Sequence, residues 1–577
     1  MSVSITIDAQ IACVLIDNPP VNATSHRVRQ CLNDAITSVE ENPDIHAVIL
    51  MCAGRTFVAG DLALEMVAGG KPISAAKAMD AGLVDRVTTD NLKGAAISFS
   101  AELALSEAPV ATQNRRVQTP ARQDVFDTKA SAIVKKARGQ NSPQAAIEAV
   151  RNALTLPAKT ALEQERRIFL SLKSDPQSKA LRHIFFAERA SGRVECIKGV
   201  SPHDLNQIGV IGGGTMGAGI AATCLLAGFQ VIMIERDIDA ALRGQKRVFG
   251  ILDGYLKRGL LSDSKHATVL GSFQTNTDYG DLVDADMVIE AVFEDMAVKT
   301  EVFQKLQAAT RPDAVLATNT SYLDINQLAA SLDDPSRVIG LHFFSPAHIM
   351  KLLEIIKTDV VADDVLATGI ALAKRLGKTA VLAGVYDGFI ANRIMSAYRR
   401  ECEYMLEDGA LPWETDRVMT AFGLPMGMFQ MQDLAGLEIS WAMRKRQAAT
   451  RATSQRNVSI ADTLCEMGRL GRKTGKGWYN YASGSAVPDL EVTDLVLSES
   501  SRKGIGRFDI PDHEIMSRIL LAMQTEGQAV LSEGIARSAD DIDVAMVNAF
   551  GFPRWWGGPM YQKHLENNAE QARKADR

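Results

Sequence analysis

The sequence feature that most limits the possible folds is QIGVIGGGTMGAGIAATCLLAGFQVIMIERD, residues 207–237. It reads as a short buried strand, a glycine-rich turn, an apolar helix and a second strand. Further apolar runs at 286–292, 314–320 and 337–344 alternate with helical patterns. Strands that alternate with helices form a mainly parallel sheet covered on both faces. We therefore expect a doubly wound α/β domain in this region.

The turn fits the pattern G-x-G-x-x-G, and Glu235 closes the strand that follows. Gly212 permits the tight turn, Gly214 lets the backbone approach a pyrophosphate, and Gly217 allows close packing of helix on strand. The N-terminus of the helix also presents free N–H groups to phosphates. Glu235 would bind a ribose diol and repel a 2′-phosphate, which favours NAD, although the adjacent Arg236 leaves an opening for NADP. A glycine-rich turn without a ligand is the alternative, and this context disfavours it.

Three later strings carry the residues of a candidate catalytic site: NTSYL (Asn319–Leu323), GLHFFSPAHIMKLLEII (Gly340–Ile356) and DGFIANRI (Asp387–Ile394). Oxidation of a secondary alcohol requires a proton acceptor, and a histidine such as His342 suits that task near neutral pH. Glu354 lies in an apolar strand, where a carboxylate is costly unless it is paired, and an imidazolium is a fitting partner. Taken alone, His342 would more often be a core residue.

Together with the glycine-rich turn, these strings resemble the 3-hydroxyacyl-CoA dehydrogenase family in order and spacing over residues 207–481. The resemblance implies that His342 is the general base and that Glu354 orients it. It also implies that Ser321 and Asn392 hold the substrate oxygen, although each could alternatively cap a helix. The residues that it places at the NAD cofactor are Gly212, Gly214, Met216, Gly217, Glu235, Glu294, Lys299 and Asn319.

The N-terminal residues resemble the start of a crotonase (enoyl-CoA hydratase/isomerase) domain in IDNPPVNA and GRTFVAGD. In that family the second string supplies a backbone N–H of an oxyanion hole. Here Ala59, Gly60 and Asp61 stand without the alanine that normally follows the glycine. The second oxyanion glycine and both catalytic glutamates of the family are missing. Glu65 is the one glutamate between residues 54 and 90, and its setting matches a later helix. We therefore expect the hydratase and isomerase activities to be lost.

An internal repeat follows the candidate catalytic site. Residues 400–429 resemble residues 525–556, with an AFG-x-P string in both. The matched pairs are Glu401 with Glu526, Leu406 with Leu531, Gly409 with Gly534, Phe422 with Phe550, Gly423 with Gly551, and Pro425 with Pro553. We interpret them as two copies of one helical domain, the second of which ends abruptly after Tyr561.

The order of these parts resembles that of the multifunctional β-oxidation enzymes. The fold expected is α/β, with a truncated crotonase-like part, a Rossmann-type NAD-binding domain and two tandem helical domains. The expected limits are 1–90 for the crotonase-like part, 91–205 for its C-terminal and linker helices, 206–386 for the NAD-binding domain, 387–482 for the first helical domain and 511–577 for the incomplete second one.

Composition limits the remaining possibilities. The chain has 577 residues, a formal net charge of −6, 46% hydrophobic and 23% charged residues. Such a balance gives no general attraction to nucleic acid, and no apolar run reaches the ~18 residues of a membrane helix. Seven scattered cysteines favour reduced thiols over disulfides or zinc, so no metal is expected. With no secretion signal and no terminal SKL tripeptide, a cytoplasmic location is expected.

The function that the resemblance implies is NAD-dependent oxidation of (S)-3-hydroxyacyl-CoA thioesters in fatty acid β-oxidation. One alternative is a bifunctional hydratase and dehydrogenase, which requires catalytic residues that are not found. Another is a non-catalytic protein that binds NAD or acyl-CoA, against which the intact catalytic set argues. A monomer is favoured because tandem helical copies can pair within one chain, although an incomplete second copy could expose an apolar face and promote self-association.

Overall fold

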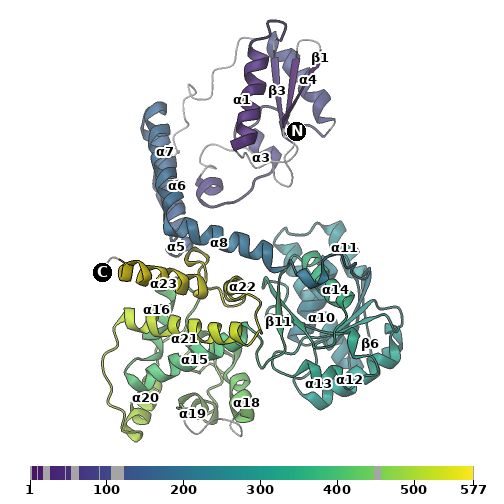
Figure 1. Cartoon of the computed structure of the whole chain (residues 1–577), viewed down its shortest axis with the longest axis vertical. Helices are drawn as coiled ribbons and strands as arrows, with labels where there is room; N and C mark the ends of the chain where they lie inside the picture. Colours follow the sequence, from purple (N-terminus) through teal and green to yellow (C-terminus); the bar gives the residue numbers. More distant parts are fainter. Residues whose placement is uncertain are drawn as a thin grey trace. The chain divides into compact units, whose positions relative to one another are not determined.

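A computed structural model of the chain describes residues 3–8, 11–16, 26–45, 47–52, 64–89, 91–105, 123–447 and 456–575. Contacts between residues divide the chain into two units, Met1–Asp175 and Pro176–Arg577 (Figure 1). The expected active-site residues all belong to the second unit. No helix in the described ranges combines the length and the apolar character that a membrane crossing requires.

The second unit contains an eight-stranded sheet in the order β11-β10-β9-β8-β7-β4-β5-β6. Its strands are β4 (Gln207–Ile211), β5 (Gln230–Ile234), β6 (Phe273–Asn276), β7 (Met287–Glu290), β8 (Val315–Thr318), β9 (Val338–Phe343), β10 (Leu352–Lys357) and β11 (Thr379–Gly384). The strands β4 to β9 are parallel and have the order of a doubly wound dinucleotide-binding sheet. The pair β10 and β11 runs antiparallel to β9. The parallel sheet expected from the sequence is confirmed.

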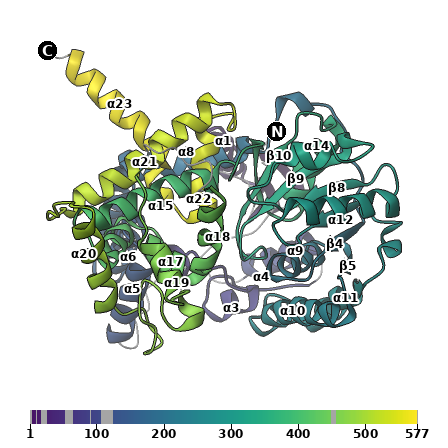
Figure 2. The same ribbon diagram turned by 90° about the horizontal axis from the view of Figure 1, so that it is seen from below.

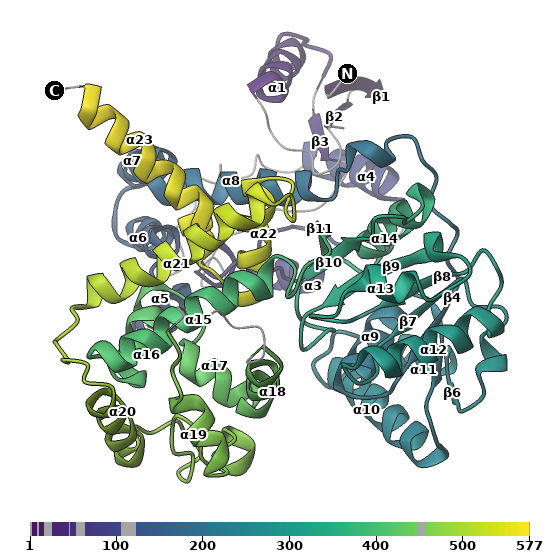
Figure 3. The same cartoon turned by 60° about the horizontal axis from the view of Figure 1, so that its bottom comes forward.

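Both faces of this sheet are buried, which explains its continuous apolar strands. Alternate residues face two cores, so that Leu353 and Ile355 of β10 contribute to one and Leu352 and Ile356 to the other. The first core is shared with α9 (Thr215–Leu226), α10 (Ile238–Lys257) and α14 (Asp363–Arg375). The second is shared with α12 (Met296–Ala309), α13 (Ile325–Ala329) and the helical part of the unit (Figures 2 and 3).

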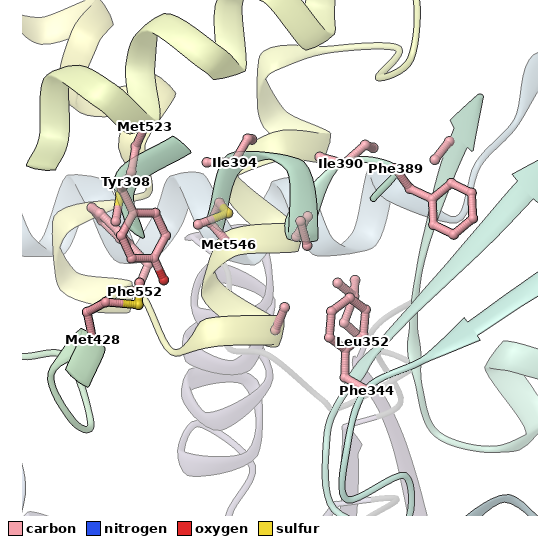
Figure 4. Close-up of a cluster of buried hydrophobic side chains, with 14 of the residues drawn as sticks. Phe344, Leu352, Phe389, Ile390, Ile394, Tyr398, Met428, Met523, Met546 and Phe552 are labelled. Atoms are coloured by element: carbon pink, nitrogen blue, oxygen red, sulfur yellow. The ribbon is translucent and has the colours of Figure 1, made fainter. Parts of the chain in front are cut away.

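The helical part of the second unit follows the sheet. Its first helices are α15 (Ala391–Asp408), α16 (Pro412–Phe422), α17 (Met428–Ala435), α18 (Leu437–Gln447), α19 (Ile460–Glu466) and α20 (Leu490–Arg502). The later ones are α21 (Asp512–Ser532), α22 (Ala539–Phe550) and α23 (Pro559–Ala575). Ile394 and Tyr398 of α15 pack with Met523 of α21 and Met546 of α22 in one core (Figure 4). The helices of the two repeats therefore share a core instead of forming separate bodies.

The two repeats have the same local construction. The helices α16 and α22 both end at a glycine in the left-handed region, Gly423 with φ 116° and Gly551 with φ 70°. Within each helix a buried aspartate accepts backbone N–H bonds from the start of the next helix. Asp416 receives them from Phe429 and Gln430, both at 2.9 Å. Asp543 receives them at 2.8 and 3.0 Å from Met560 and Tyr561.

The first unit has a small three-stranded sheet. Its strands are β1 (Val3–Asp8), β2 (Ile11–Ile16) and β3 (Ala47–Cys52), with β1 antiparallel and β3 parallel to β2. The helices are α1 (His26–Glu40), α3 (Ala75–Asp80), α4 (Leu92–Ala104), α5 (Gln123–Ala137), α6 (Asn141–Thr155) and α7 (Ala158–Ser174), together with a short π-helix, η1 (Leu64–Ala68). Pro157 is the N-cap of α7, and Pro176 is the first residue of the helix that follows α7. On β1, Ile5 and Ile7 remain exposed.

Candidate active site

The glycine-rich turn has the geometry of a phosphate-binding turn. Gly212 adopts φ 95°, which glycine accepts without strain. A Cβ added at Gly217 would overlap the carbonyl oxygen of Gly212, so helix and turn pack too closely for any other residue. A Cβ at Gly214 would meet no atom within 4 Å. Gly214 is the N-cap of α9 and no side chain caps that helix, so its first N–H groups are open to an anion. The turn therefore fits a bound pyrophosphate.

Glu235 lies at the end of β5, beside the turn. Its Oε1 accepts a hydrogen bond from the Gly213 N–H at 2.6 Å, which fixes the carboxylate against the glycine-rich turn. Arg236 is exposed and its Nε donates to Asp237 at 3.0 Å. The Arg236 guanidinium could bind the 2′-phosphate of NADP, but here it forms an ion pair with Asp237.

His342 and Glu354 face each other across β9 and β10. They are directly paired in the antiparallel register, and His342 Nδ1 lies 2.7 Å from Glu354 Oε2. Both side chains are buried, with 3% and 0% of their surface exposed. The other Glu354 oxygen accepts N–H bonds from Ile390 at 3.3 Å and Ala391 at 3.0 Å, at the start of α15. Glu354 therefore has the imidazole partner that the sequence predicts for a carboxylate in an apolar strand.

The other histidine nitrogen, Nε2, lies 3.2 Å from Ser321 Oγ. The loop that carries Ser321 is held by Glu294, whose Oε1 accepts N–H bonds from Ser321 at 2.8 Å and Tyr322 at 3.1 Å. Asn319 fastens the same loop to β9 by accepting the Phe343 N–H at 2.8 Å. This network sets the serine hydroxyl beside the imidazole.

Lys299, which the resemblance places at the cofactor, is bonded to carboxylates of the protein. Only 1% of it is exposed, and its Nζ lies 2.7 Å from Glu290 Oε1 and 3.5 Å from Glu294 Oε2. Glu290 also accepts a bond from the Thr318 hydroxyl at 2.7 Å. The ammonium thus neutralises two carboxylates beneath the Ser321 loop, and its predicted contact with a cofactor remains a prediction.

One pocket of about 600 Å³ joins these groups. Ser321, His342 and Asn392 line it, and Met216 connects it to the start of α9. Among the described residues nothing bonds to the Asn392 side-chain amide, although only 9% of the residue is exposed. The pocket therefore brings together all four residues expected to be catalytic, with Glu354 behind His342.

The structure also adds residues that the sequence did not indicate. Ala549 and Phe550, at the end of α22, line the same pocket, so the second helical repeat contributes a wall. Arg399 lines it from α15, two turns beyond Asn392. The helical spacing of Asn392, Met395 and Arg399 was the available signal, but spacing does not tell which face of a helix meets a ligand.

Comparison with known proteins agrees with this geometry. Residues 207–385 match the family described as 3-hydroxyacyl-CoA dehydrogenase, NAD binding domain, and residues 388–481 match its C-terminal domain. The peroxisomal bifunctional enzyme of Danio rerio is 36% identical over 547 residues, which cover 90% of this chain and 75% of the relative. The corresponding enzyme of Homo sapiens is 34% identical over 522 residues, covering 86% and 72%.

A solved structure is also similar. It is the 3-hydroxybutyryl-CoA dehydrogenase from Escherichia coli K12, with a TM-score of 0.55 and 26% sequence identity, covering 63% of this chain and 92% of that one. The fold, the site and these matches define an NAD-dependent 3-hydroxyacyl-CoA dehydrogenase. The chain belongs to the multifunctional β-oxidation enzyme family, which includes the peroxisomal bifunctional enzymes.

The cytoplasmic location expected from the sequence is contradicted by these relatives. Those from Danio rerio and Homo sapiens are named peroxisomal, and one from Brassica napus is named glyoxysomal. The expectation was wrong because reduced cysteines and the lack of a secretion signal do not distinguish one reducing compartment from another.

Proposed function

We propose that this enzyme oxidises (S)-3-hydroxyacyl-CoA to 3-oxoacyl-CoA, with His342 as the general base. The observation that carries this proposal is the Glu354–His342–Ser321 chain of hydrogen bonds, at 2.7 and 3.2 Å, ending in a pocket with the amide of Asn392. A base that is oriented by a third group and aimed at a reactant oxygen is the arrangement that proton abstraction requires.

The chemistry follows from the two imidazole nitrogens. When Nδ1 carries a proton and donates it to Glu354, Nε2 is left as the acceptor on the pocket side. Nε2 then takes the proton of the substrate 3-hydroxyl, and the Glu354 carboxylate stabilises the imidazolium. Ser321 and Asn392 hold the substrate oxygen as it becomes a carbonyl. NAD, when bound, supplies the acceptor for the hydride that leaves the same carbon.

We assign the cofactor to the residues around the glycine-rich turn. Gly212, Gly214 and Gly217 hold the pyrophosphate at the start of α9, and Glu235 holds a ribose. Met216 and Asn319 lie at the pocket, where the nicotinamide must meet the substrate. Glu294 and Lys299 support the loop between them.

The test compares wild type with His342→Ala and His348→Ala in the oxidation of 3-hydroxybutyryl-CoA with NAD⁺. His348 lies in the same β9–β10 connection but lines a separate hollow with Tyr255, so its loss serves as the control. We expect His342→Ala to lower kcat by about 10²- to 10⁴-fold and His348→Ala to leave it nearly unchanged. Equal, slow rates for all three proteins would show that the assignment is wrong.

We also propose that the first unit is a crotonase-like remnant without hydratase activity. A hydratase needs carboxylates to activate water and two donors for the enolate oxygen. Glu65 is held by Lys129 at 3.0 Å, and this bond lowers the pKa of the carboxyl, which makes it a poor proton donor. The turn of Ala59, Gly60 and Asp61 lies outside the described residues.

Hydration of crotonyl-CoA by the same preparation tests this second proposal. We expect a rate at the background level while 3-hydroxybutyryl-CoA is oxidised. A hydration rate clearly above background would instead support the bifunctional alternative.

The helices α21, α22 and α23 are, we propose, a second copy of the helical domain. The matching glycine caps and buried aspartates support this proposal. Because the two copies share a core within one chain, the proposed state in solution is a monomer. The domain limits at 90, 205, 386 and 482 remain predictions.

A further inference from the structure

A second pocket lies at the β11 edge of the large sheet. Its volume is about 720 Å³, within the size range of small-molecule sites. It is bordered by the segment after α8 (Pro176–Ser191), the carboxyl ends of β10 and β11, and the turn between α21 and α22. The described residues that line it are different from those that line the active-site pocket, so the two cavities are separate.

The walls of this second pocket are fastened to one another. The helices α8 and α22 pack together and against β11 (Figure 3). Gly384, the last residue of β11, donates its N–H to the Ile535 carbonyl in the α21–α22 turn at 2.9 Å. Arg537 joins the same turn to the segment after α8 by donating to the carbonyl oxygens of Ser191 at 2.6 Å and Arg193 at 3.0 Å. The cavity is therefore preformed, as ligand pockets usually are.

The carboxylates at the border of the second pocket already have partners. Glu195 Oε1 lies 3.1 Å from the Lys198 ammonium, and both side chains are exposed. Asp359 Oδ2 accepts a hydrogen bond from the Asn326 side-chain amide at 2.9 Å. Neither carboxylate forms an ion pair with a cation that lines the pocket, as far as the described residues extend.

Two of the three cations in the lining are unpaired. Arg537 binds Asp541 at 2.9 Å. For the side chains of Arg193 and Lys357, by contrast, the described part of the chain offers neither a carboxylate within ion-pair distance nor a bonded acceptor. Arg193 is exposed at the border of the pocket, and Lys357 is half-buried at the end of β10. The pocket therefore has an excess of positive charge.

Thr358, the residue after Lys357, supplies a second and independent observation. It lines the pocket and is fully buried, and its hydroxyl has no hydrogen-bond partner among the described residues. A buried hydroxyl without a partner is costly, and native proteins rarely contain one. The missing partner therefore indicates a ligand that accepts a hydrogen bond beside the two cations.

The remaining lining is aliphatic. It is made by Val194, Leu382, Ala383 and Ile535. The described residues of the lining include no aromatic side chain on which a nucleobase could stack. The pocket thus offers cations and a hydroxyl to an anionic group, and aliphatic surface to the rest of the ligand.

We propose that this pocket is a second binding site, which takes an organic anion with a carboxylate or phosphate group on an aliphatic body. The anionic oxygens accept bonds from Arg193, Lys357 and the Thr358 hydroxyl, and such charge-assisted bonds are the stronger ones. The aliphatic body covers Leu382 and Ile535 and removes their surface from water. The site does not depend on the dehydrogenase function proposed above, so each proposal can fail without the other.

A free thiol reports on the occupancy of this pocket. Cys196 lines the pocket and is exposed, so a bound ligand should slow its alkylation by iodoacetamide. Mass spectrometry of the peptide that contains Cys196 measures this rate in the full chain. Cys31 of α1 is a second free cysteine and serves as the internal reference. A probe that enters only the active-site pocket does not touch the Cys196 thiol.

The probes are octanoate, octyl phosphate, 1-octanol and inorganic phosphate. We expect at least one of the two amphiphilic anions to slow the alkylation of Cys196 by about fivefold or more at saturation, because the ligand excludes the reagent. The alkylation of Cys31 should be unchanged. Protection by octanoate alone would identify a carboxylate ligand, and protection by octyl phosphate alone would identify a phosphate ligand. 1-Octanol and inorganic phosphate should protect much less, since each lacks one half of the proposed ligand.

Three variants test the residues of the site. Lys357→Gln and Arg193→Gln should each raise the Kd of the protecting anion by about tenfold, because each removes a charge-assisted bond. Thr358→Val should also weaken binding but should leave the thermal midpoint unchanged or raise it, because it removes a buried unpaired hydroxyl. Lys374→Gln is the control, since this lysine of α14 is exposed and lies outside the lining.

Four results would overturn the proposal. The first is a rate for Cys196 that neither amphiphilic anion changes. The second is equal protection by 1-octanol, which would show that charge is not recognised, and the third is equal protection by inorganic phosphate, which would show that the aliphatic body is not. The fourth is protection that persists unchanged in Lys357→Gln, Arg193→Gln and Thr358→Val, or that Lys374→Gln weakens as much as they do.

Discussion

Single residues decide whether the glycine-rich turn can hold its ligand. Gly214→Ala should raise the Kd for NADH by about tenfold or more, because its new methyl group enters the space where the phosphate approaches the helix N-terminus. The same change should leave the thermal midpoint nearly unaltered, since that methyl meets no protein atom within 4 Å. Fluorescence titration and thermal unfolding measure the two quantities.

Gly217→Ala is the matched comparison. Its methyl would overlap the Gly212 carbonyl oxygen, so it should lower the thermal midpoint as well as weaken NADH binding. Equal effects of the two substitutions on stability would contradict the packing described for the turn.

For single residues, the sequence predicted the catalytic side chains better than it predicted the residues that surround them. His342 and Glu354 were predictable because a histidine and a carboxylate in two adjacent apolar strands need each other. The burial of Lys299 between Glu290 and Glu294 could not be predicted, since nothing in EAVFEDMAVK indicates which carboxylates point into the interior. Arg399 was missed for the same reason. Its place in the pocket wall depends on a cavity that several distant helices form together.

Among the elements, α15 links the catalytic pair to the second helical repeat. Its start donates to Glu354, and Arg393 donates to Glu526 at 2.6 Å and to Glu533 at 2.6 and 2.8 Å. Glu526 and Glu533 belong to α21 and to the turn that follows it. Arg393 is mostly buried and directly follows Asn392, so these bonds fix the position of the Asn392 amide.

Glu526→Gln combined with Glu533→Gln should therefore lower kcat for 3-hydroxybutyryl-CoA by about tenfold or more, because small displacements of a positioned group are costly. Binding of NADH should be unchanged. Asp512→Asn is the control, since the Arg417–Asp512 pair also joins α16 to α21 but is 58% and 61% exposed, and exposed pairs contribute little. A similar fall in kcat for Asp512→Asn would point to general loosening instead.

Elements themselves were largely predictable. The strands of the large sheet follow from their apolar runs, and the breaks between α6, α7 and α8 (Pro176–Ser191) follow from Pro157 and Pro176. The repeat was visible in its glycines, because Gly423 and Gly551 both end a helix in the left-handed region. Pairing of the two copies within one chain was expected, but the residues of α15, α21 and α22 that form their shared core could not be identified, because non-local packing decides them.

On the scale of the whole second unit, α8, at the start of the unit, binds residues near the end of the unit. His183 Nε2 lies 2.9 Å from Asp543 Oδ2, and its ring stacks on Tyr561. Glu188 binds Arg554 at 2.6 Å. Burial by itself lowers the pKa of His183, but the bond to Asp543 raises it, and the net direction is upward. Burial raises the pKa of Asp543 to about 6.

These directions predict how stability depends on pH. A histidine with a raised folded pKa stabilises the fold fully below its unfolded pKa of about 6.5, and that contribution is lost as pH rises through the folded pKa. His183→Gln should therefore cost about 1–2 kcal/mol near pH 6.5 and less near pH 9. Urea unfolding followed by tryptophan fluorescence measures the difference. Lys198→Gln, which removes an exposed pair with Glu195, should cost nothing at either pH.

The arrangement of the first unit was predictable only in part. Val3 of β1 packs with Val14 and with Ala35 of α1, whereas Ile5 and Ile7 farther along the same strand are exposed. The resemblance of this segment to a crotonase domain does not by itself show how the segment packs.

The presence of Ala549 and Phe550 in the pocket wall has a consequence for how this enzyme can evolve. A repeat that carries no catalytic residue still borders the substrate, so inherited changes there can alter which thioesters are accepted while the proton-transfer machinery stays intact. The proton-transfer residues and this part of the pocket wall thus lie in different parts of the chain, so selection can preserve the former while the latter changes.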